Sequence, residues 1–497
     1  MRTRLRFLIG QERRELAEVE PTLTVLDYLR QVERRMGTKE GCAEGDCGAC
    51  TVVLARPVEG RIRYCAVNSC ILFLGQIDGC QLLTVEDLPD RRGTLHPVQE
   101  AMVECHATQC GFCTPGFVMS LFALYENTPR PDDGTPPPST QRIDDALAGN
   151  LCRCTGYQPI VAAAERMFEL GRGQPDRFAS RRPDMLDRLE ALEDNETLAV
   201  GHGDRRFFAP ASVEALAALL LDHPTACVVA GATDVGLWVT KDLRELDPLI
   251  HIGRVRELQQ IVDIGSGLEI GAGVTYADAE IALSAHYPDM GELLRRLGGE
   301  QVRNLGTIGG NIANGSPIGD SPPALIAMSA QLVLRRGDEQ REMALEDFFI
   351  EYGKQDRRPS EFVEKIIVPK PARGTRFRAY KVAKRFDQDI SSVLGAFALR
   401  LQHDNVASIR IAYGGMAGTP QRALHAENAL RDQPWNAASV EAAIEAMADD
   451  FSPISDWRAS AAYRNKAARN LLHRLLIETT EHETQTRLVG NRDLARV

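Results

Sequence analysis

Two short cysteine-bearing segments, each followed by a predicted helix, constrain this chain more than any other feature. The first covers residues 109–116 and spaces its cysteines as C-x2-C, and the second covers residues 149–157 and spaces them as C-x-C. Helix N-termini expose unpaired N–H groups and favour negative charge, so two helix starts can stabilise thiolates that bind iron. The pattern predicts a 2Fe–2S cluster in a small helical domain. The predicted ligands are Cys110, Cys113, Cys152 and Cys154.

Structural zinc and disulfides are the competing explanations for these cysteines. Zinc sites usually combine two C-x2-C pairs separated by ~15–20 residues, whereas here the gap is longer and the second pair is C-x-C. Twelve cysteines in 497 residues are too few for a disulfide scaffold, and the cytosol keeps thiols reduced. Eleven of the twelve lie between Cys42 and Cys154, with Cys227 beyond them. Metal ligation explains this crowding better than chance does.

A second cysteine loop lies at residues 41–50 and has the spacing C-x4-C-x2-C, which is typical of plant-type ferredoxins. Its cysteines are Cys42, Cys47 and Cys50, and its glycines allow the backbone to wrap closely and point N–H groups at the sulfurs. A fourth ligand must follow, and the spacing leaves three candidates. Cys65 falls in a predicted strand, Cys70 at a break between strand and loop, and Cys80 just before the last predicted strand.

Length and charge set the class of protein. A chain of 497 residues is long enough for three or four domains of ~100–200 residues each. A net charge of -11 argues against a nucleic-acid partner. The apolar run at the N-terminus is too short for a signal peptide, and no run approaches the ~18 residues of a membrane span. We therefore expect a soluble, cytoplasmic protein with no membrane or nucleic-acid partner.

Local patterns predict several elements around these loops. Alternating residues 4–9 and residues 15–19 predict a hairpin. In the helical domain, Thr114 can cap a helix that has Pro115 in its first turn. Two hairpin-like helix pairs would then present their ends to one cluster. Residues 171–184 lack an apolar period and predict a linker, which runs into a short helix at 185–192.

The chain beyond residue 207 carries two glycine-rich loops, at residues 226–235 and 303–320. Such loops expose backbone N–H groups that can hold a pyrophosphate, although many ordinary strand–helix turns look the same. Neither loop has the Rossmann spacing G-x-G-x-x-G. Lys381 lies near the expected flavin face, and its plainer interpretation is a solvated surface charge. A late helix at 459–477 is expected to place Tyr463, Ala467, Leu471 and Leu475 inward.

The order of these pieces resembles the iron–sulfur and flavin chains of the molybdenum hydroxylase family, such as the small subunit of bacterial xanthine dehydrogenase. The resemblance rests on the motifs at residues 44–50, 109–116, 150–157 and 309–320 and covers nearly the whole chain. It implies a multidomain α+β protein. Its expected parts are a β-grasp ferredoxin-like domain (1–88), a four-helix 2Fe–2S domain (89–170), a linker (171–200), an α+β FAD-binding domain of the vanillyl-alcohol-oxidase/PCMH type (201–372) and an α+β C-terminal domain like that of CO dehydrogenase flavoproteins (373–497).

The resemblance also assigns residues. The family's fourth ferredoxin-domain ligand lies in an Asn-x-Cys motif, which here is Asn68-Ser-Cys70 and favours Cys70 over Cys65. Gln109 matches a glutamine that touches molybdopterin on the neighbouring domain, and its plainer interpretation is a polar residue at a helix end. Ala232 stands where many relatives have a glycine. The implied FAD contacts are Val228, Val229, Ala230, Gly231, Ala232, Thr233, Asp234, Val235, Thr307, Gly309, Gly310, Asn311, Asp320 and Lys381.

The function implied by the resemblance is electron transfer. Electrons left on molybdenum by the oxidation of hypoxanthine and xanthine to urate would pass through the two 2Fe–2S clusters to FAD and then to NAD+. The molybdopterin site, and with it the catalytic residues and the substrate specificity, would lie on a partner chain in a heterotetramer of two small and two large chains. Alternatives are a molybdenum hydroxylase for aldehydes, nicotinate or CO, a flavoprotein reductase without molybdenum, and an accessory factor for cofactor loading.

Overall fold

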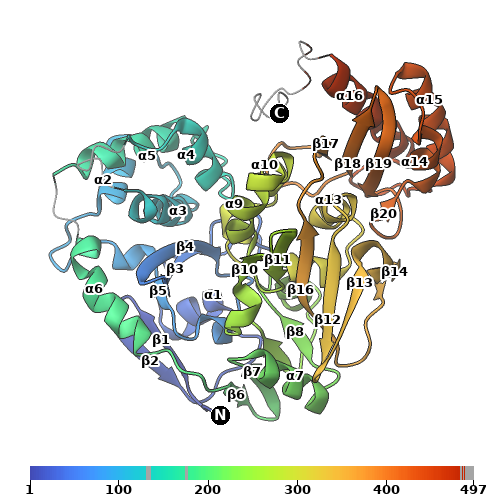
Figure 1. Cartoon of the computed structure of the whole chain (residues 1–497). Helices are drawn as coiled ribbons and strands as arrows, with labels where there is room; N and C mark the ends of the chain where they lie inside the picture. Colours follow the sequence, from blue (N-terminus) through green and yellow to red (C-terminus); the bar gives the residue numbers. More distant parts are fainter. Residues whose placement is uncertain (130–135, 174–176, 482–483, 485, 487–497) are drawn as a thin grey trace. The chain divides into compact units, whose positions relative to one another are not determined.

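The computed structural model describes the chain except for residues 130–135, 174–176, 482–483, 485 and 487–497 (Figure 1). The chain forms two compact units. Unit 1 contains Met1–Arg256 and Gly298–Gly306, and unit 2 contains Glu257–Leu297 and Thr307–Val497. Both units mix helices and sheets, which confirms the predicted α+β class.

Unit 1 begins with a five-stranded sheet in the order β2-β1-β5-β3-β4, in which β1 and β5 are parallel and the other neighbours are antiparallel. The hairpin predicted at the N-terminus is confirmed, but its second strand lies earlier than residues 15–19. The glycine turn at Gly10 is so tight that the chain pairs again from Glu12. The elements are β1 (Leu5–Ile9), β2 (Glu12–Leu16), α1 (Val25–Asp27), η1 (Tyr28–Val32), β3 (Thr51–Val58), β4 (Arg61–Asn68), η2 (Leu74–Ile77), β5 (Gln81–Leu83) and η3 (Val85–Asp87).

Four helices follow and share one apolar core with a face of this sheet (Figure 1). Phe117, Leu121 and Phe122 of the central helix α3 are fully buried and lie in the same cluster as Val53 and Tyr64 of the sheet. The predicted cap at Thr114 is displaced by one residue, because α3 already begins at Thr114 and Cys113 is its N-cap. The helices are α2 (Pro97–Glu104), α3 (Thr114–Asn127), α4 (Thr140–Leu147) and α5 (Gln158–Leu170).

The segment predicted as a linker is largely helical. Helix α6 (Arg177–Glu190) begins before the expected residue 185 and accommodates Pro183 inside it. Its Met185 and Leu189 are buried against Leu8 of β1, and Phe178 packs on the core of the helical domain. These few apolar anchors are too widely spaced to give a recognisable period, which explains why the sequence pattern missed most of the helix.

The rest of unit 1 is a four-stranded sheet in the order β6-β7-β9-β8 with two helices, together with a returning segment, Gly298–Gly306. Ser212 caps α7 by accepting a hydrogen bond from the Ala215 N–H. The elements are β6 (Leu198–His202), β7 (Arg205–Ala209), α7 (Val213–Asp222), β8 (Cys227–Val229), α8 (Val235–Thr240), β9 (Leu249–His251) and α11 (Glu300–Arg303).

Unit 2 contains an antiparallel sheet in the order β10-β11-β16-β12-β13 and a second sheet in the order β17-β18-β19-β20. Its first elements are η5 (Arg256–Gln259), β10 (Ile261–Asp263), β11 (Gly267–Gly271), α9 (Tyr276–His286), α10 (Pro288–Arg295), α12 (Ile308–Asn314), α13 (Ser321–Ala327), β12 (Gln331–Arg336), β13 (Glu339–Ala344), η6 (Leu345–Phe348), β14 (Phe349–Glu351), β15 (Lys354–Gln355) and β16 (Phe362–Pro369). Its last elements are β17 (Thr375–Val382), β18 (Val393–Gln402), β19 (Asn405–Gly414), β20 (Gln421–Arg422), α14 (Leu424–Leu430), α15 (Ala437–Ala446), η7 (Met447–Asp449) and α16 (Ala461–Thr480).

Helix α16 corrects one predicted core residue. Leu471 and Leu475 are buried as expected, but Tyr463 is 51% exposed. Its neighbour Arg464 lies inward instead and is 1% exposed, because its guanidinium donates two hydrogen bonds of 2.8 Å to Asp456. A buried ion pair therefore takes the place that the apolar period assigned to an aromatic ring.

Candidate iron–sulfur and flavin sites

The first cysteine quartet, Cys42, Cys47, Cys50 and Cys70, is assembled by the loop before β3 and the turn after β4. The side chain of Cys42 accepts a backbone N–H bond of 3.4 Å from Cys47. Hydrogen bonds from Cys47 and then Cys70 hold the pKa of the Cys42 thiol below its ordinary value, and a hydrogen bond from Cys70 does the same for Cys50. Thiolates are the form of cysteine that binds metal.

Cys70, rather than Cys65 or Cys80, lies with the other members of this quartet. Cys70 packs in one small cluster with Cys50. Cys65 pairs with Leu54 across β3 and β4, and both Cys65 and Cys80 pack against the main core of the sheet. The structure therefore places the two rival candidates in a different environment from Cys70.

The second quartet, Cys110, Cys113, Cys152 and Cys154, brings together the segments before α3 and α5. The sulfurs of Cys110 and Cys154 are 3.6 Å apart, and both residues are exposed. A hydrogen bond from the backbone N–H of Phe112 lowers the pKa of Cys110, and a hydrogen bond from the thiol of Cys154 lowers it as well. Burial, with a hydrogen bond to Cys152, raises the pKa of Cys113 to about 12. The thiols of this quartet thus meet in two pairs.

The loops of the two quartets touch each other directly. The backbone N–H of Leu151 donates to the carbonyl oxygen of Cys47 at 2.9 Å. Asn150 is buried beside this bond and donates to the carbonyl oxygen of Gly48 at 3.1 Å. Close packing of three glycines, Gly48, Gly116 and Gly149, permits the approach. A Cβ atom on Gly48 would lie 2.2 Å from the carbonyl oxygen of Gly149, and one on Gly116 would lie 2.2 Å from that of Gly48.

The first predicted flavin segment, residues 228–235, follows β8 in unit 1. Its start is held by Gln76, whose amide donates to the Ala230 carbonyl at 2.8 Å, and by His251, whose Nδ1 lies 3.1 Å from the Val229 carbonyl oxygen. Burial lowers the pKa of His251 to about 4. Ala232 has a φ of 57°, in the left-handed region that glycine adopts more readily than alanine does.

Helix α8 continues from this segment and rests on the first quartet's loop. The hydroxyl of Thr240 donates to the Ala43 carbonyl at 2.7 Å, and Lys241 donates to the Cys42 carbonyl. A Cβ atom on Gly236 would lie 2.6 Å from the carbonyl oxygen of Ile71. Helix α8, which follows the predicted flavin loop, therefore contacts the 41–50 loop of the first quartet and also Ile71, next to Cys70.

The other predicted flavin residues lie in unit 2. Thr307 caps α12 by accepting from the Gly310 N–H at 2.9 Å, and Gly309 lies so close to Ala272 that a Cβ atom would be 2.4 Å from its side chain. Asn311 accepts a hydrogen bond of 2.9 Å from Ser321, which follows Asp320. Lys381 pairs with Asp320.

The interpretation of Lys381 as a solvated surface charge is wrong. Its side chain is 2% exposed, and besides the ion pair with Asp320 it donates to Ser391 at 3.1 Å. Ser391 in turn donates to the same carboxylate at 2.6 Å. The structure thus joins Asp320, Lys381 and Ser391 in one buried network.

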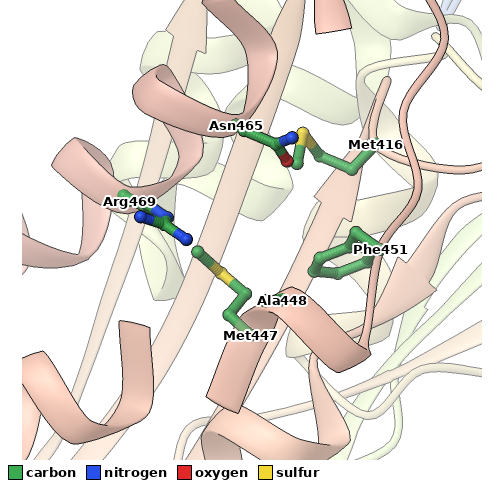
Figure 2. A pocket seen from close by; sticks show the side chains of 6 residues that line it. All are labelled: Met416, Met447, Ala448, Phe451, Asn465 and Arg469. Carbon is green, nitrogen blue, oxygen red and sulfur yellow. The ribbon is translucent and has the colours of Figure 1, made fainter. Parts of the chain in front are cut away.

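Gln109 is exposed beside the second quartet. A separate cavity of about 80 Å³ in unit 2 contains no predicted site residue (Figure 2). Met416, Met447 and Phe451 line it, with Asn465 and Arg469 from α16 (Figure 2).

Among the residues that the structure describes, no three His, Cys, Asp or Glu side chains are arranged to hold one metal ion. A 2Fe–2S cluster shares its four cysteines between two irons, so the paired thiol contacts are the arrangement to expect of it. No described helix is both long and apolar enough to cross a bilayer.

Comparisons with known proteins match the chain piece by piece. Family models match a 2Fe-2S iron-sulfur cluster binding domain at residues 7–73 and a 2Fe-2S binding domain at residues 84–165. The FAD binding domain in molybdopterin dehydrogenase matches residues 202–371, and the CO dehydrogenase flavoprotein C-terminal domain matches residues 378–479. Carbon monoxide dehydrogenase from Hydrogenophaga pseudoflava is 31% identical with a TM-score of 0.52, and the match covers 94% of that chain and 54% of this one. The chain belongs to the molybdenum hydroxylase family.

Longer proteins of the same family are also similar to this chain. Xanthine dehydrogenase of Emericella nidulans is 30% identical over 95% of this chain, and that of Drosophila subobscura is 32% identical over 87%. Aldehyde oxidase 1 of Rattus norvegicus is 29% identical over 90% of this chain. The chain spans only 38%, 36% and 37% of the lengths of these three relatives. As a molybdenum hydroxylase chain, it carries two 2Fe–2S-binding domains and an FAD-binding domain.

Sequence reasoning missed the residues that join the two cysteine loops. Asn150 was read only as part of a motif, and Gln301 was not singled out. Asn150 lies between Gly149 and Cys152, in a motif whose cysteines bind metal without a side-chain amide. An amide at this position could therefore have indicated a structural role. Gln301 had no local signal, because its partners are distant in sequence.

Replacing Lys381 tests the buried network of unit 2. We expect Lys381→Met to leave the Asp320 carboxylate buried without its cation and to destabilise unit 2 by roughly 3–5 kcal/mol. We also expect it to lower the FAD bound per chain. The control is Lys365→Met, which removes a partly exposed pair with Glu269 and should cost only about 0–1 kcal/mol. Thermal midpoints and FAD per chain measure both. Equal losses in the two variants would contradict this role of Lys381.

Proposed function

We propose that this chain is the electron-transfer chain of a xanthine dehydrogenase. In this proposal, electrons from the oxidation of hypoxanthine and xanthine to urate pass from a molybdopterin site on a partner chain through two 2Fe–2S clusters and FAD to NAD+. Iron–sulfur clusters carry single electrons and a flavin can collect two and release a hydride, which is the chemistry these groups supply when bound. The catalytic residues for the purine then lie on the partner, and two copies of this chain form a heterotetramer with two copies of the partner.

The observation that carries the proposal is an unbroken order of contacts. The exposed second quartet is followed by the first quartet, through the 2.9 Å bond from Leu151 to Cys47. The first quartet is followed by the 228–235 segment, through Thr240 on Ala43 and Gln76 on Ala230. An electron carrier needs its redox groups in such a sequence, with one end open to the donor. Gln109, exposed at that open end, is our proposed contact to the partner's molybdopterin.

The residues present suit the groups that the proposal requires. Each quartet offers four sulfurs in contact, as a chain of contacts in the first and as two pairs in the second. We propose that all eight are cluster ligands, with Cys70 the fourth of the first quartet. Residues 228–235 turn through left-handed Ala232, and such turns bring successive backbone N–H groups together to hold an anion such as a pyrophosphate. In unit 2 we propose Thr307, Gly309, Gly310, Asn311, Asp320 and Lys381 as further FAD contacts. None of the twelve cysteines forms a disulfide, which suits our proposal of a cytoplasmic location.

The proposed domain plan follows the same residues. We propose an iron–sulfur domain at 1–88, a helical iron–sulfur domain at 89–170, a connecting segment at 171–200, a flavin domain at 201–372 and a C-terminal domain at 373–497. The connecting segment contains α6, which binds it to both iron–sulfur domains through Phe178 and Met185.

The proposal is tested by assaying the chain assembled with its molybdopterin partner. Xanthine-dependent reduction of NAD+ to NADH, abolished when this chain is omitted, is the expected result. A second candidate is an aldehyde or carbon monoxide oxidising enzyme, favoured by the identities of 29% to aldehyde oxidase 1 and 31% to carbon monoxide dehydrogenase. Turnover of an aldehyde or of carbon monoxide, without turnover of xanthine, would support that candidate and contradict the first.

A further inference from the structure

A short segment of the flavin domain's sequence is built into the iron–sulfur part of the molecule. Gly298–Gly306 belongs to unit 1, whereas the residues before and after it belong to unit 2. Glu300 pairs with Arg142 of α4 at 2.7 Å, and Asn304 donates to the carbonyl of Ala66 in β4 at 2.9 Å. The next residue after the segment is Thr307, which caps α12. The segment therefore links the iron–sulfur core covalently to a predicted flavin loop.

Gln301 occupies the centre of this segment and is 1% exposed. Its amide nitrogen lies 2.9 Å from Oδ1 of Asn150, 3.1 Å from the hydroxyl of Ser120 and 3.3 Å from the hydroxyl of Thr51. These partners come from different places: Ser120 from α3, Thr51 from β3, and Asn150 from the loop that leads to Cys152. One side chain thus contacts β3, α3 and the loop that leads to Cys152, next to the contact between the two quartets.

The hydrogen-bond roles at this contact require a donor at Gln301. The Ser120 hydroxyl gives its proton to Asn150 at 2.7 Å, and the Thr51 hydroxyl gives its proton to the Gly48 carbonyl at 2.7 Å. Both hydroxyls and the Asn150 oxygen are then acceptors toward Gln301. The Gln301 amide oxygen is buried and has no hydrogen-bond partner among the described residues. The hydrogen bonds of this side chain are therefore made by its amide nitrogen. Its donor nitrogen closes the network.

We propose that Gln301 is a positioning residue that fixes the two cysteine quartets relative to each other. Thr51 directly follows Cys50, and Asn150 precedes Cys152 by two positions, so the amide of Gln301 fastens one ligand loop to the other. This inference rests on the proposed function only in that the quartets hold 2Fe–2S clusters. It adds that a residue of the flavin domain's sequence sets the geometry between them.

The test uses the purified full-length chain with its clusters, reduced with dithionite and examined by electron paramagnetic resonance. Two reduced clusters held close together interact magnetically, and the interaction depends steeply on their separation and orientation. We expect Gln301→Leu to keep the iron content of the unchanged protein and to lose part or all of the spin–spin splitting. Glu300→Gln is the matched control, because it alters the neighbouring, more exposed ion pair and should leave the splitting unchanged.

Ser120→Ala provides a second variant, which removes a partner of Gln301 that lies on α3, outside the two cysteine loops. It is expected to change the splitting in the same direction, and the double variant should show less than the sum of the single effects because both act on one network. Unchanged splitting in an iron-replete Gln301→Leu protein would overturn the inference. If Gln301→Leu does not retain iron, unchanged splitting in the Ser120→Ala protein would overturn the inference. Absence of two cluster signals in the unchanged protein would instead contradict the proposed function.

Discussion

Cys70→Ala is expected to lose one of the two iron–sulfur clusters, so that bound iron falls from about four to about two atoms per chain. The physical reason is that Cys70 is 3% exposed and hydrogen-bonds with both Cys42 and Cys50, so its removal opens the quartet on one side. Iron analysis, together with the loss of one of two paramagnetic signals after reduction, measures the effect.

Cys65→Ala is the matched control for this prediction, because Cys65 lies on the same stretch of chain and packs in the core of the sheet. It removes a thiol of the same size and should keep about four iron atoms per chain. The opposite pattern, in which Cys65→Ala loses iron and Cys70→Ala keeps it, would show that the first cluster uses Cys65 and that the Asn68-Ser-Cys70 motif does not supply a ligand.

Gly48→Ala is expected to have a large structural effect on unit 1. Gly48 has a φ of 68°, and a Cβ atom there would lie 2.2 Å from the Gly149 carbonyl oxygen. The left-handed conformation costs an alanine about 1–2 kcal/mol, and the overlap with a backbone atom adds about 1–3 kcal/mol or more because neither loop can give way freely. We expect a lower thermal midpoint and loss of iron, since both loops carry cluster ligands.

Gly60→Ala separates the two contributions to that effect. Gly60 lies in the turn between β3 and β4 with a φ of 72°, and a Cβ atom there would meet nothing within 4 Å. Gly60→Ala therefore costs only the left-handed backbone strain of about 1–2 kcal/mol. Thermal unfolding and iron analysis of the two variants side by side measure the difference. Equal behaviour of Gly48→Ala and Gly60→Ala would contradict the close packing of the two cluster loops.

The cysteine loops could be predicted from the sequence because ligand spacing is a local property. A cluster needs thiols a few residues apart on a tight turn, and that requirement leaves a visible pattern at residues 41–50 and 109–116. The choice between Cys65 and Cys70 could not be made from spacing, since both follow β3 at plausible distances. The choice of Cys70 required the resemblance of the Asn68-Ser-Cys70 motif to that of a known family. The structure shows only where each thiol lies.

Long-range polar contacts escaped prediction for a physical reason. Lys381 looked like a surface charge because its buried partner, Asp320, is 61 positions away, and nothing near Lys381 announces an ion pair. Gln301 and Asn150 are 151 positions apart, and their bond forms only because three glycines let the two cluster loops approach. The first part of helix α6, before the predicted residues 185–192, was missed because its apolar residues serve two separate cores. Periodicity detects one continuous face and does not detect such divided packing.

The most direct test of the central claim is an anaerobic titration of the purified chain with NADH, in which the flavin and iron–sulfur absorption bands are followed together. We predict that both sets of bands bleach, because the flavin exchanges hydride with the nicotinamide and the clusters exchange electrons with the flavin. Dithionite serves as the reference for complete reduction. If dithionite bleaches all the bands and NADH leaves them unchanged, the chain does not deliver electrons to NAD+, and the proposed xanthine dehydrogenase function is contradicted.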